Sequence, residues 1–163
     1  MDLIEMAVDS IRIHMPSGQH VVVLKEKDAE RFLPIWVGSA EANAIALKMD
    51  GIDTERPVTH DLMANMLEAL GVTITRVVVS ELRNDTFHAR ILGRVGGRDL
   101  ELDSRSSDAI ALALRVNSPI YVSSEVMDQA AVIPRGEDEE SKLEVFQQMV
   151  NEMNLPDLDD RES

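Results

Sequence analysis

The apolar residues of this 163-residue chain change their spacing several times, and this change restricts the folds that it can adopt. Around residues 6–13 they partly alternate with polar residues, which is typical of a strand with one buried face. From Ala42 to Met49 they recur every third or fourth residue, which is typical of an amphipathic helix. Both spacings recur further along the chain, so we expect helices and strands together in one α/β (α+β) fold.

Seven segments are expected to form strands. The turn at residues 16–18, Pro-Ser-Gly, joins the first two strands in antiparallel fashion. Pro34 places the third strand at an edge of the sheet or at a bulge, because proline cannot donate a ladder hydrogen bond. The fourth, fifth and sixth are separated by short turns and are expected to form a meander. The strands are expected at residues 6–13, 20–24, 32–37, 72–79, 86–92, 98–103 and 120–123.

Three helices are expected between these strands. The first begins near Ser39, a candidate N-cap, and stops at Gly51. The second begins at Thr59 and stops at Gly71, and the third begins at Ser107. The pattern on the second helix predicts a buried face made of Leu62, Met63, Met66, Leu67 and Leu70. These segments predict a mostly antiparallel, mixed sheet with three packed helices, plus a C-terminal helix.

The end of the chain differs from the rest in its charge. The formal net charge is −14, of which residues 1–125 carry −6 and residues 126–163 carry −8. Such a charge opposes non-specific binding to nucleic acid and counts against a nuclease. We expect a compact domain over residues 3–131, a linker over 132–137, a helix over 138–155 and an acidic, disordered tail over 156–163.

The composition excludes several kinds of chemistry. The chain contains no cysteine, so disulfides, thiolate nucleophiles and cysteine-bound metal centres are excluded. Any metal must be held by oxygen or imidazole ligands. The acidic N-terminal residues lack the basic start of a secretory signal, and no apolar run is long enough to span a membrane. We therefore expect a cytoplasmic protein with no membrane partner.

Charged or titratable residues lie at the start of each expected helix. These residues are Glu41, His60 with Asp61, and Arg105 with Asp108. A structural explanation is available, because acids in the first turn of a helix complement its dipole and cap its N–H groups. Residues at the spacing of Arg105 and Asp108 also form local ion pairs. The functional interpretation rests on His60, since an imidazole beside a carboxylate can act as a general base or metal ligand.

Three carboxylates share one face of the strand expected at residues 98–103. Asp99, Glu101 and Asp103 lie two residues apart, so their side chains project to the same side. Carboxylate oxygens are the ligands that Mg²⁺ prefers, and Mn²⁺ accepts them too, so a site for either ion is one interpretation. The alternative is a strand face exposed to solvent.

Three blocks of sequence resemble the signature blocks of the bifunctional nuclease domain family, in the order and with a spacing similar to that of the family. The blocks are LPIWVG at 33–38 followed by Glu41 and Ala42, RPVTHDL at 56–62, and DSRSSDAIALA at 103–113. The resemblance covers residues 3–131. One departure is Ser106, where the family commonly has proline, although serine also starts helices. The resemblance implies a compact α/β domain, a homodimer or larger homo-oligomer, and a nuclease that acts on DNA and RNA.

The same resemblance groups the residues at the helix starts into one site. It implies catalytic roles for Glu41, His60, Asp61 and Asp108, and it implies that Arg105 and Ser107 bind the substrate. In this hypothesis Arg105 neutralises a phosphate, and His60 or a carboxylate-bound Mg²⁺ or Mn²⁺ activates water. Asp103 is the candidate metal ligand. Nucleic acid is then the expected partner.

Two other functions fit the same residues. In the first, the site belongs to a binding module that holds a small anion or a peptide without breaking a bond. In the second, the blocks only maintain helix caps and subunit contacts in a structural oligomer. The family resemblance favours the nuclease, with the binding module as the alternative.

Overall fold

The computed structural model describes residues 2–134 of the chain. The helix expected over 138–155 and the tail over 156–163 lie outside the described residues. Residues 1–132 form one compact unit. The strands are β1 (Leu3–His14), β2 (Gln19–Glu26), β3 (Phe32–Val37), β4 (Val72–Arg83), β5 (Thr86–Val95), β6 (Arg98–Arg105) and β7 (Ile120–Ser123). The helices are α1 (Ser39–Met49), α2 (Thr59–Ala69), α3 (Ser106–Val116) and α4 (Ser124–Ala130).

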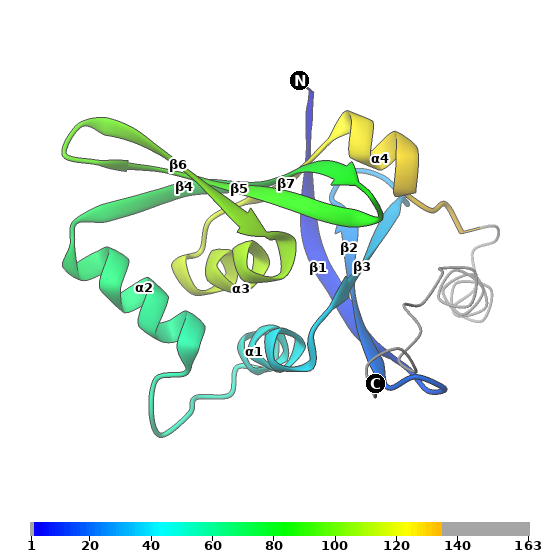
Figure 1. Ribbon diagram of the computed structural model, residues 1–163, viewed down its shortest axis with the longest axis horizontal. Coiled ribbons are helices and arrows are strands. Elements are labelled where there is room, and N and C mark those ends of the chain that lie inside the picture. The colour runs from blue at the N-terminus through cyan, green and yellow to red at the C-terminus, as the bar shows by residue number, and fades with distance from the viewer. Residues whose placement is uncertain (1, 135–163) are drawn as a thin grey trace, which may run out of the picture. The chain divides into compact units, whose positions relative to one another are not determined.

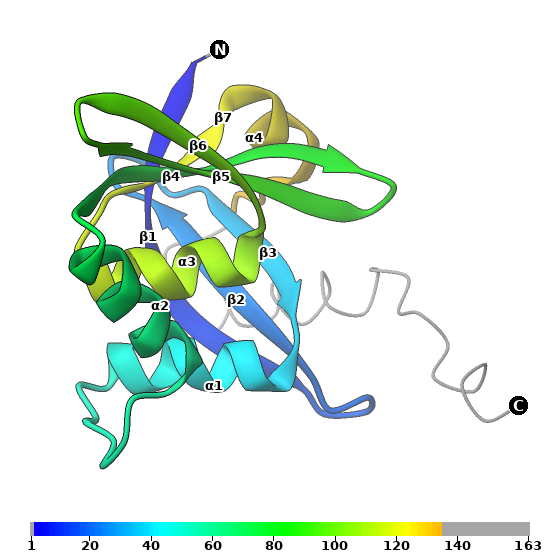
Figure 2. The same ribbon diagram turned by 60° about the vertical axis from the view of Figure 1, so that its left-hand side comes forward.

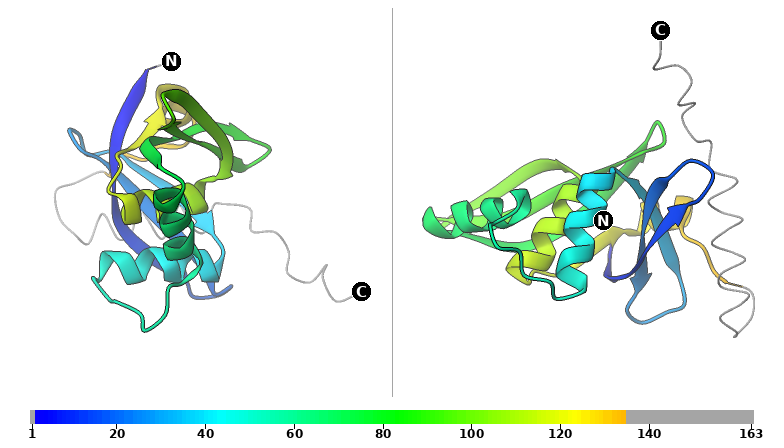
Figure 3. Two further views of the ribbon diagram at one scale, coloured as in Figure 1. Left: turned by 90° about the vertical axis from the view of Figure 1, so that its left-hand side faces the viewer. Right: turned by 90° about the horizontal axis from the view of Figure 1, so that it is seen from below.

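All seven strands join one sheet, in the order β3-β2-β1-β7-β4-β5-β6. Each neighbouring pair is antiparallel except β4 and β7, which are parallel. The short β7 therefore links two antiparallel halves, β1–β3 and β4–β6, which are turned strongly relative to each other (Figure 3). The expected α+β class with a mostly antiparallel, mixed sheet is confirmed. Pro34 lies on the edge strand β3, as predicted.

α2 and α3 pack against one side of the β4–β6 half, and α4 lies on the other side (Figure 1, Figure 2). α1 packs against α3 and β2. The central helix is α3, which packs against β4 and β5 and lies between α1 and α2. Its buried face contains Ala109, Ala111 and Ala113, whose small side chains allow close approach of the neighbouring helices. This packing brings the first turns of α1, α2 and α3 close together.

The β4–β5 and β5–β6 turns fix the register of the meander. Asn84 and Asp85 have φ values of 52° and 59°, and Gly96 and Gly97 have 53° and 76°. Two consecutive residues with positive φ are the signature of the two-residue turn that matches the twist of a hairpin. Because these turns set where β6 begins, they also set where Arg105, its last residue, meets α3.

The structure corrects the predicted burial of α2. Leu62, Met66 and Leu70 are 53%, 54% and 70% exposed, whereas they were expected to form a buried face. Met63 and Leu67 are only half-buried, and the buried residue of α2 is His60. The helical period was read correctly, but the larger part of the apolar stripe faces away from α3. The position of α2 that packs against α3 is occupied by a polar residue, His60.

Two further differences concern the start of α1 and a helix that the sequence analysis did not predict. Gly38, and not Ser39, is the N-cap of α1, and no side chain caps that end. The sequence analysis also missed α4, which begins after Ser123 and is capped by the hydroxyl of that residue. Its seven residues are too few to show a clear helical period. Among the described residues, no helix is long and apolar enough to cross a membrane.

Candidate functional site

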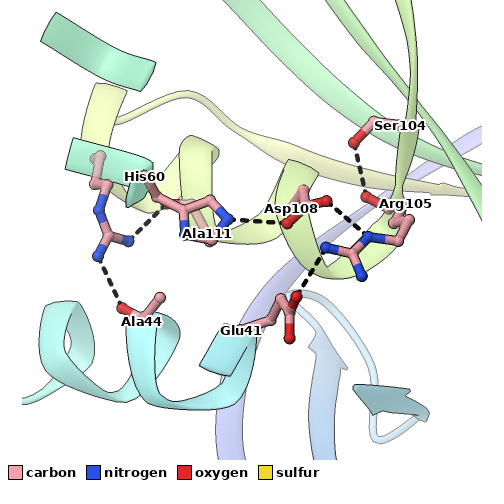
Figure 4. A network of polar contacts seen from close by, with 8 residues as sticks. Glu41, Ala44, His60, Ser104, Arg105, Asp108 and Ala111 are labelled. Carbon is pink, nitrogen blue, oxygen red and sulfur yellow. Dashed lines mark hydrogen bonds and ion pairs between the residues drawn. The ribbon is translucent and has the colours of Figure 1, made fainter. Parts of the chain in front are cut away.

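Four side chains from the starts of three helices form one continuous polar network (Figure 4). Glu41 comes from the first turn of α1, His60 from the first turn of α2, and Asp108 from the first turn of α3. Arg105 ends β6 and is the N-cap of α3. The order of contacts is His60, Asp108, Arg105, Glu41, so residues from three separate sequence blocks meet.

His60 is held by Asp108 in one orientation. Its Nε2 lies 2.9 Å from Oδ1 of Asp108, and its side chain is only 7% exposed. A carboxylate can only accept hydrogen bonds, so Nε2 carries the proton. In the neutral ring the other nitrogen, Nδ1, then has a lone pair, and it has no hydrogen-bond partner among the described residues. This is the arrangement of a general base oriented by a carboxylate.

Arg105 lies between two carboxylates and still faces solvent. Its Nε donates to Oδ2 of Asp108 at 2.8 Å, and its Nη2 donates to Oε1 of Glu41 at 2.8 Å. The side chain is 65% exposed. A guanidinium has five N–H donors, and no described residue accepts from the others. Arg105 therefore has donors available for an anion such as phosphate.

The network fixes the charges of Asp108 and Arg105. Burial raises the pKa of Asp108, but the hydrogen bonds from Arg105 and His60 outweigh that effect and hold the pKa below its ordinary value. The hydrogen bonds to Asp108 and Glu41 raise the pKa of Arg105 above its ordinary value. Asp108 is therefore an ionised acceptor at neutral pH, and Arg105 is a permanent cation.

The glycine before α1 allows the Glu41 side chain to fold back over the helix start. A Cβ built on Gly38 would overlap Oε2 of Glu41. The contact involves the end of a flexible side chain, so a larger residue at position 38 would displace the carboxylate without breaking the helix. Gly38 thus permits the position in which Glu41 reaches Arg105.

Asp61 belongs to a second network, which joins the three helices. Its Oδ1 accepts from Nε of Arg115 at 2.6 Å, and its Oδ2 accepts from the backbone N–H of Val58 at 3.0 Å. Arg115 is 4% exposed and also donates to the carbonyl oxygens of Ala111 and Ala44. Two of these contacts are drawn in Figure 4. One oxygen of Asp61 therefore links α2 to Arg115 of α3, which also contacts α1, and the other oxygen caps the start of α2. Sequence analysis did not single out Arg115.

The first network borders a pocket of about 660 Å³. Its polar end contains Glu41, His60, Arg105 and Asp108. Asn43, Thr59, Asp103 and Ser104 also line it. Aliphatic side chains form another part of its wall, and sequence analysis did not connect them with the site. They include Leu47, Val58, Met63, Ile91 and Leu102.

Asp103 and the two other carboxylates of β6 lie in a cross-strand ladder of ion pairs. Arg90 lies 3.9 Å from Asp103 and 3.8 Å from Glu101, and Arg94 lies 3.6 Å from Asp99. Asp103 also borders the pocket. Among the described residues, no three His, Asp or Glu side chains are placed to hold a metal ion. The ladder corresponds to the solvent-exposed face that was one of the two interpretations.

Ser107, the other expected substrate ligand, is buried in the first turn of α3. It does not line the pocket. The site brought together by the structure therefore contains Glu41, His60, Arg105 and Asp108, with Asp61 and Ser107 outside it.

Comparisons with known proteins identify the family of the chain. The model of the bifunctional nuclease domain matches residues 22–135, which is more than half of the chain. The chain belongs to the bifunctional nuclease domain family. All four residues of the network lie within the matched range. The resemblance inferred from the three sequence blocks is thereby confirmed.

Relatives in this family include bacterial and plant proteins. An uncharacterized protein of Mycobacterium tuberculosis is 41% identical over 142 residues, which cover 86% of this chain and 85% of that protein. Bifunctional nuclease 1 of Oryza sativa subsp. indica is 28% identical over 120 residues, covering 71% of this chain but 36% of the plant protein. Bifunctional nuclease 1 of Arabidopsis thaliana is 28% identical over 120 residues, which cover 66% of this chain and 37% of the plant protein. The plant proteins are thus similar to this chain over about a third of their length.

Proposed function

We propose that this protein is a nuclease that hydrolyses phosphodiester bonds of DNA and RNA at the His60–Asp108–Arg105 network. Membership of the bifunctional nuclease domain family supports the reaction class. The observation that carries the proposal is the pair of contacts made by Asp108, which orients an imidazole with one oxygen and an arginine with the other. A general base and an anion-binding group are thereby held side by side at one pocket.

The proposed reaction begins with a water molecule next to Nδ1 of His60. The imidazole takes a proton from the water while the water oxygen forms a bond to phosphorus. The bond between phosphorus and the leaving oxygen then breaks, and this oxygen takes a proton from the imidazolium or from solvent. Arg105 offsets the negative charge that develops on the phosphate oxygens. Asp108 is the positioning residue for both groups.

Mg²⁺ or Mn²⁺ remains an expected cofactor but is assigned no step. Glu41 and Asp108 already bind Arg105, and Asp103 lies near Arg90, so the described carboxylates do not form a preformed metal site. Mg²⁺ in proteins is often held by one or two carboxylates together with substrate phosphates. Asp103 at the rim of the pocket is the residue that would supply such a carboxylate.

A cleavage assay tests the proposed function. Purified protein is incubated with labelled single- and double-stranded DNA and RNA, in Mg²⁺, Mn²⁺ or EDTA. The His60→Gln variant should cleave at least about 100-fold more slowly, which is the lower range for losing a general base. The His20→Gln variant is the control, because His20 lies on β2 outside the network. Equal cleavage by His60→Gln and wild type would contradict the proposal.

The charge of the network favours one other function, a binding module without catalysis. Arg105 is offset by two carboxylates, Glu41 and Asp108, and the whole chain carries −14. These charges weaken the attraction for a polyanion. A binding module would bind an anionic ligand saturably at the pocket and release no product from any of the four substrates.

A further inference from the structure

One part of the pocket is not used by the proposed hydrolysis. Leu47 of α1, Met63 of α2 and the cross-strand neighbours Ile91 and Leu102 form an aliphatic wall. Leu102 is 42% exposed, although it is a large apolar side chain on the inner face of the sheet. An apolar surface left open inside a pocket is a typical feature of a ligand site.

The aliphatic wall lies beside the charged end of the pocket at a defined separation. Leu102 precedes Arg105 by three residues on β6, which corresponds to about 10 Å of strand. Leu47 follows Glu41 by six residues on α1, which corresponds to about 9 Å of helix. On each of these two elements an apolar lining residue therefore lies about 10 Å from a charged one. Asn43, Thr59, Asp103 and Ser104 also line the pocket.

The size of the pocket restricts what can occupy both ends. A volume of about 660 Å³ is in the range of sites for single small molecules. A base within a duplex is stacked on both faces and cannot enter such a pocket unless it leaves the stack. In a single strand, or at a frayed end of a duplex, a base can leave the stack at little cost in free energy.

We propose that the pocket binds one unstacked nucleotide, with its phosphate at Arg105 and its base against the aliphatic wall formed by Leu47, Met63, Ile91 and Leu102. This inference rests on the proposed nuclease function and names its substrate class, which is single-stranded nucleic acid. No aromatic side chain lines the pocket within the described part of the chain, so aliphatic groups and the polarizable sulfur of Met63 cover the face of the base.

Binding of small probes to the full chain tests the inference without requiring cleavage. The probes are adenosine 5′-monophosphate and ribose 5-phosphate, which differ only in the base, and affinity is measured by titration calorimetry. The nucleotide should bind at least about tenfold more tightly, which corresponds to about 1.4 kcal/mol. The Leu102→Gln variant should lose this preference while its affinity for ribose 5-phosphate is unchanged.

Two control variants separate the two ends of the pocket. Ile13→Gln changes another exposed aliphatic residue of a strand, outside this pocket, and should retain the preference for the nucleotide. Arg105→Gln should weaken the binding of both probes to the same extent. Equal affinity of the wild type for the two probes, or an unchanged preference in Leu102→Gln, would overturn the inference.

The outcomes also separate this inference from the proposed reaction. If the nucleotide binds through Leu102 but no nucleic acid is cleaved, the pocket inference stands and the nuclease proposal fails. If His60-dependent cleavage occurs while both probes bind equally, the reaction stands and the pocket inference fails. Faster cleavage of a blunt duplex than of the corresponding single strand would also contradict the pocket inference.

Discussion

His60 and Asp108 are 48 positions apart in the sequence, and Nε2 of the first lies 2.9 Å from Oδ1 of the second. The contact forms because α2 and α3 pack side by side with their first turns adjacent. The other oxygen of Asp108 holds Arg105. One carboxylate therefore determines the orientation of both groups to which we assign the chemistry.

The first prediction concerns Asp108. In Asp108→Asn the side chain keeps its shape but loses the charge that stabilises an imidazolium and pairs with Arg105. We expect kcat to fall by about 100-fold or more, with a smaller rise in KM. The melting temperature should fall as well, because the lowered pKa of Asp108 means that its ionised form stabilises the folded state. Steady-state kinetics on a single-stranded substrate measure both constants. A change confined to KM would show that Asp108 serves only binding.

The second prediction concerns the carboxylate that competes with the substrate for Arg105. Glu41→Gln removes one negative charge 2.8 Å from the guanidinium. We expect a KM about two- to fivefold lower, because a partly exposed ion pair is worth on the order of 1 kcal/mol. Gly38→Ala should act in the same direction, since its Cβ displaces the Glu41 side chain. A higher KM in both variants would indicate that Glu41 holds Arg105 in its working position.

The residues of the site were predictable from sequence, but their division into two networks was not. Glu41, His60, Arg105 and Asp108 all lie at apparent helix starts, and local signals mark such starts well. Asp61 is adjacent to His60 in sequence, yet a helix rotates consecutive side chains by about 100°. The two residues therefore face different partners, Asp108 and Arg115.

Long-range packing explains the remaining errors. The period of α2 predicted an apolar stripe, but the period alone does not tell whether a neighbour covers that stripe. Arg115 resembles an ordinary basic residue in the last turn of a helix. Its burial follows only from the approach of α1 and α2 to α3, which no local pattern encodes.

The third prediction uses the exposed stripe of α2. Leu62, Met66 and Leu70 recur every fourth residue and are each more than half exposed. We expect them to lie in the contact of the homodimer or larger homo-oligomer that the family resemblance implies. Met66→Lys should shift a homodimer or larger assembly toward the monomer, because it places like charges in a symmetric contact. Light scattering measures the mass. The matched control is Ile133→Lys, and an unchanged mass in Met66→Lys would exclude this surface.

The fourth prediction concerns stability and the buried Arg115. Arg115→Met removes the cation that pairs with Asp61 and donates to α1 and α3, and it leaves Asp61 with only the Val58 N–H. Because the Asp61 side chain is 33% exposed, its carboxylate stays partly solvated, and the loss of the pair should cost about 1–3 kcal/mol. We expect a lower melting temperature and a lower free energy of unfolding in urea. A decrease of less than about 1 kcal/mol in the free energy of unfolding would show that the contacts of Arg115 do not hold the three helices together.

The pH dependence of stability gives a separate test of Asp61. Burial raises the pKa of Asp61, but the hydrogen bonds from Val58 and Arg115 outweigh it and hold the pKa below 3.8. Because the folded state binds this proton less readily than the unfolded state, the stabilisation is complete above the ordinary pKa and is lost as the pH falls through the folded value. The stability difference between wild type and Asp61→Asn should therefore shrink between about pH 5 and pH 2. Asp53→Asn, in an exposed loop, is the control, and a difference that stays constant over this range would contradict the assignment.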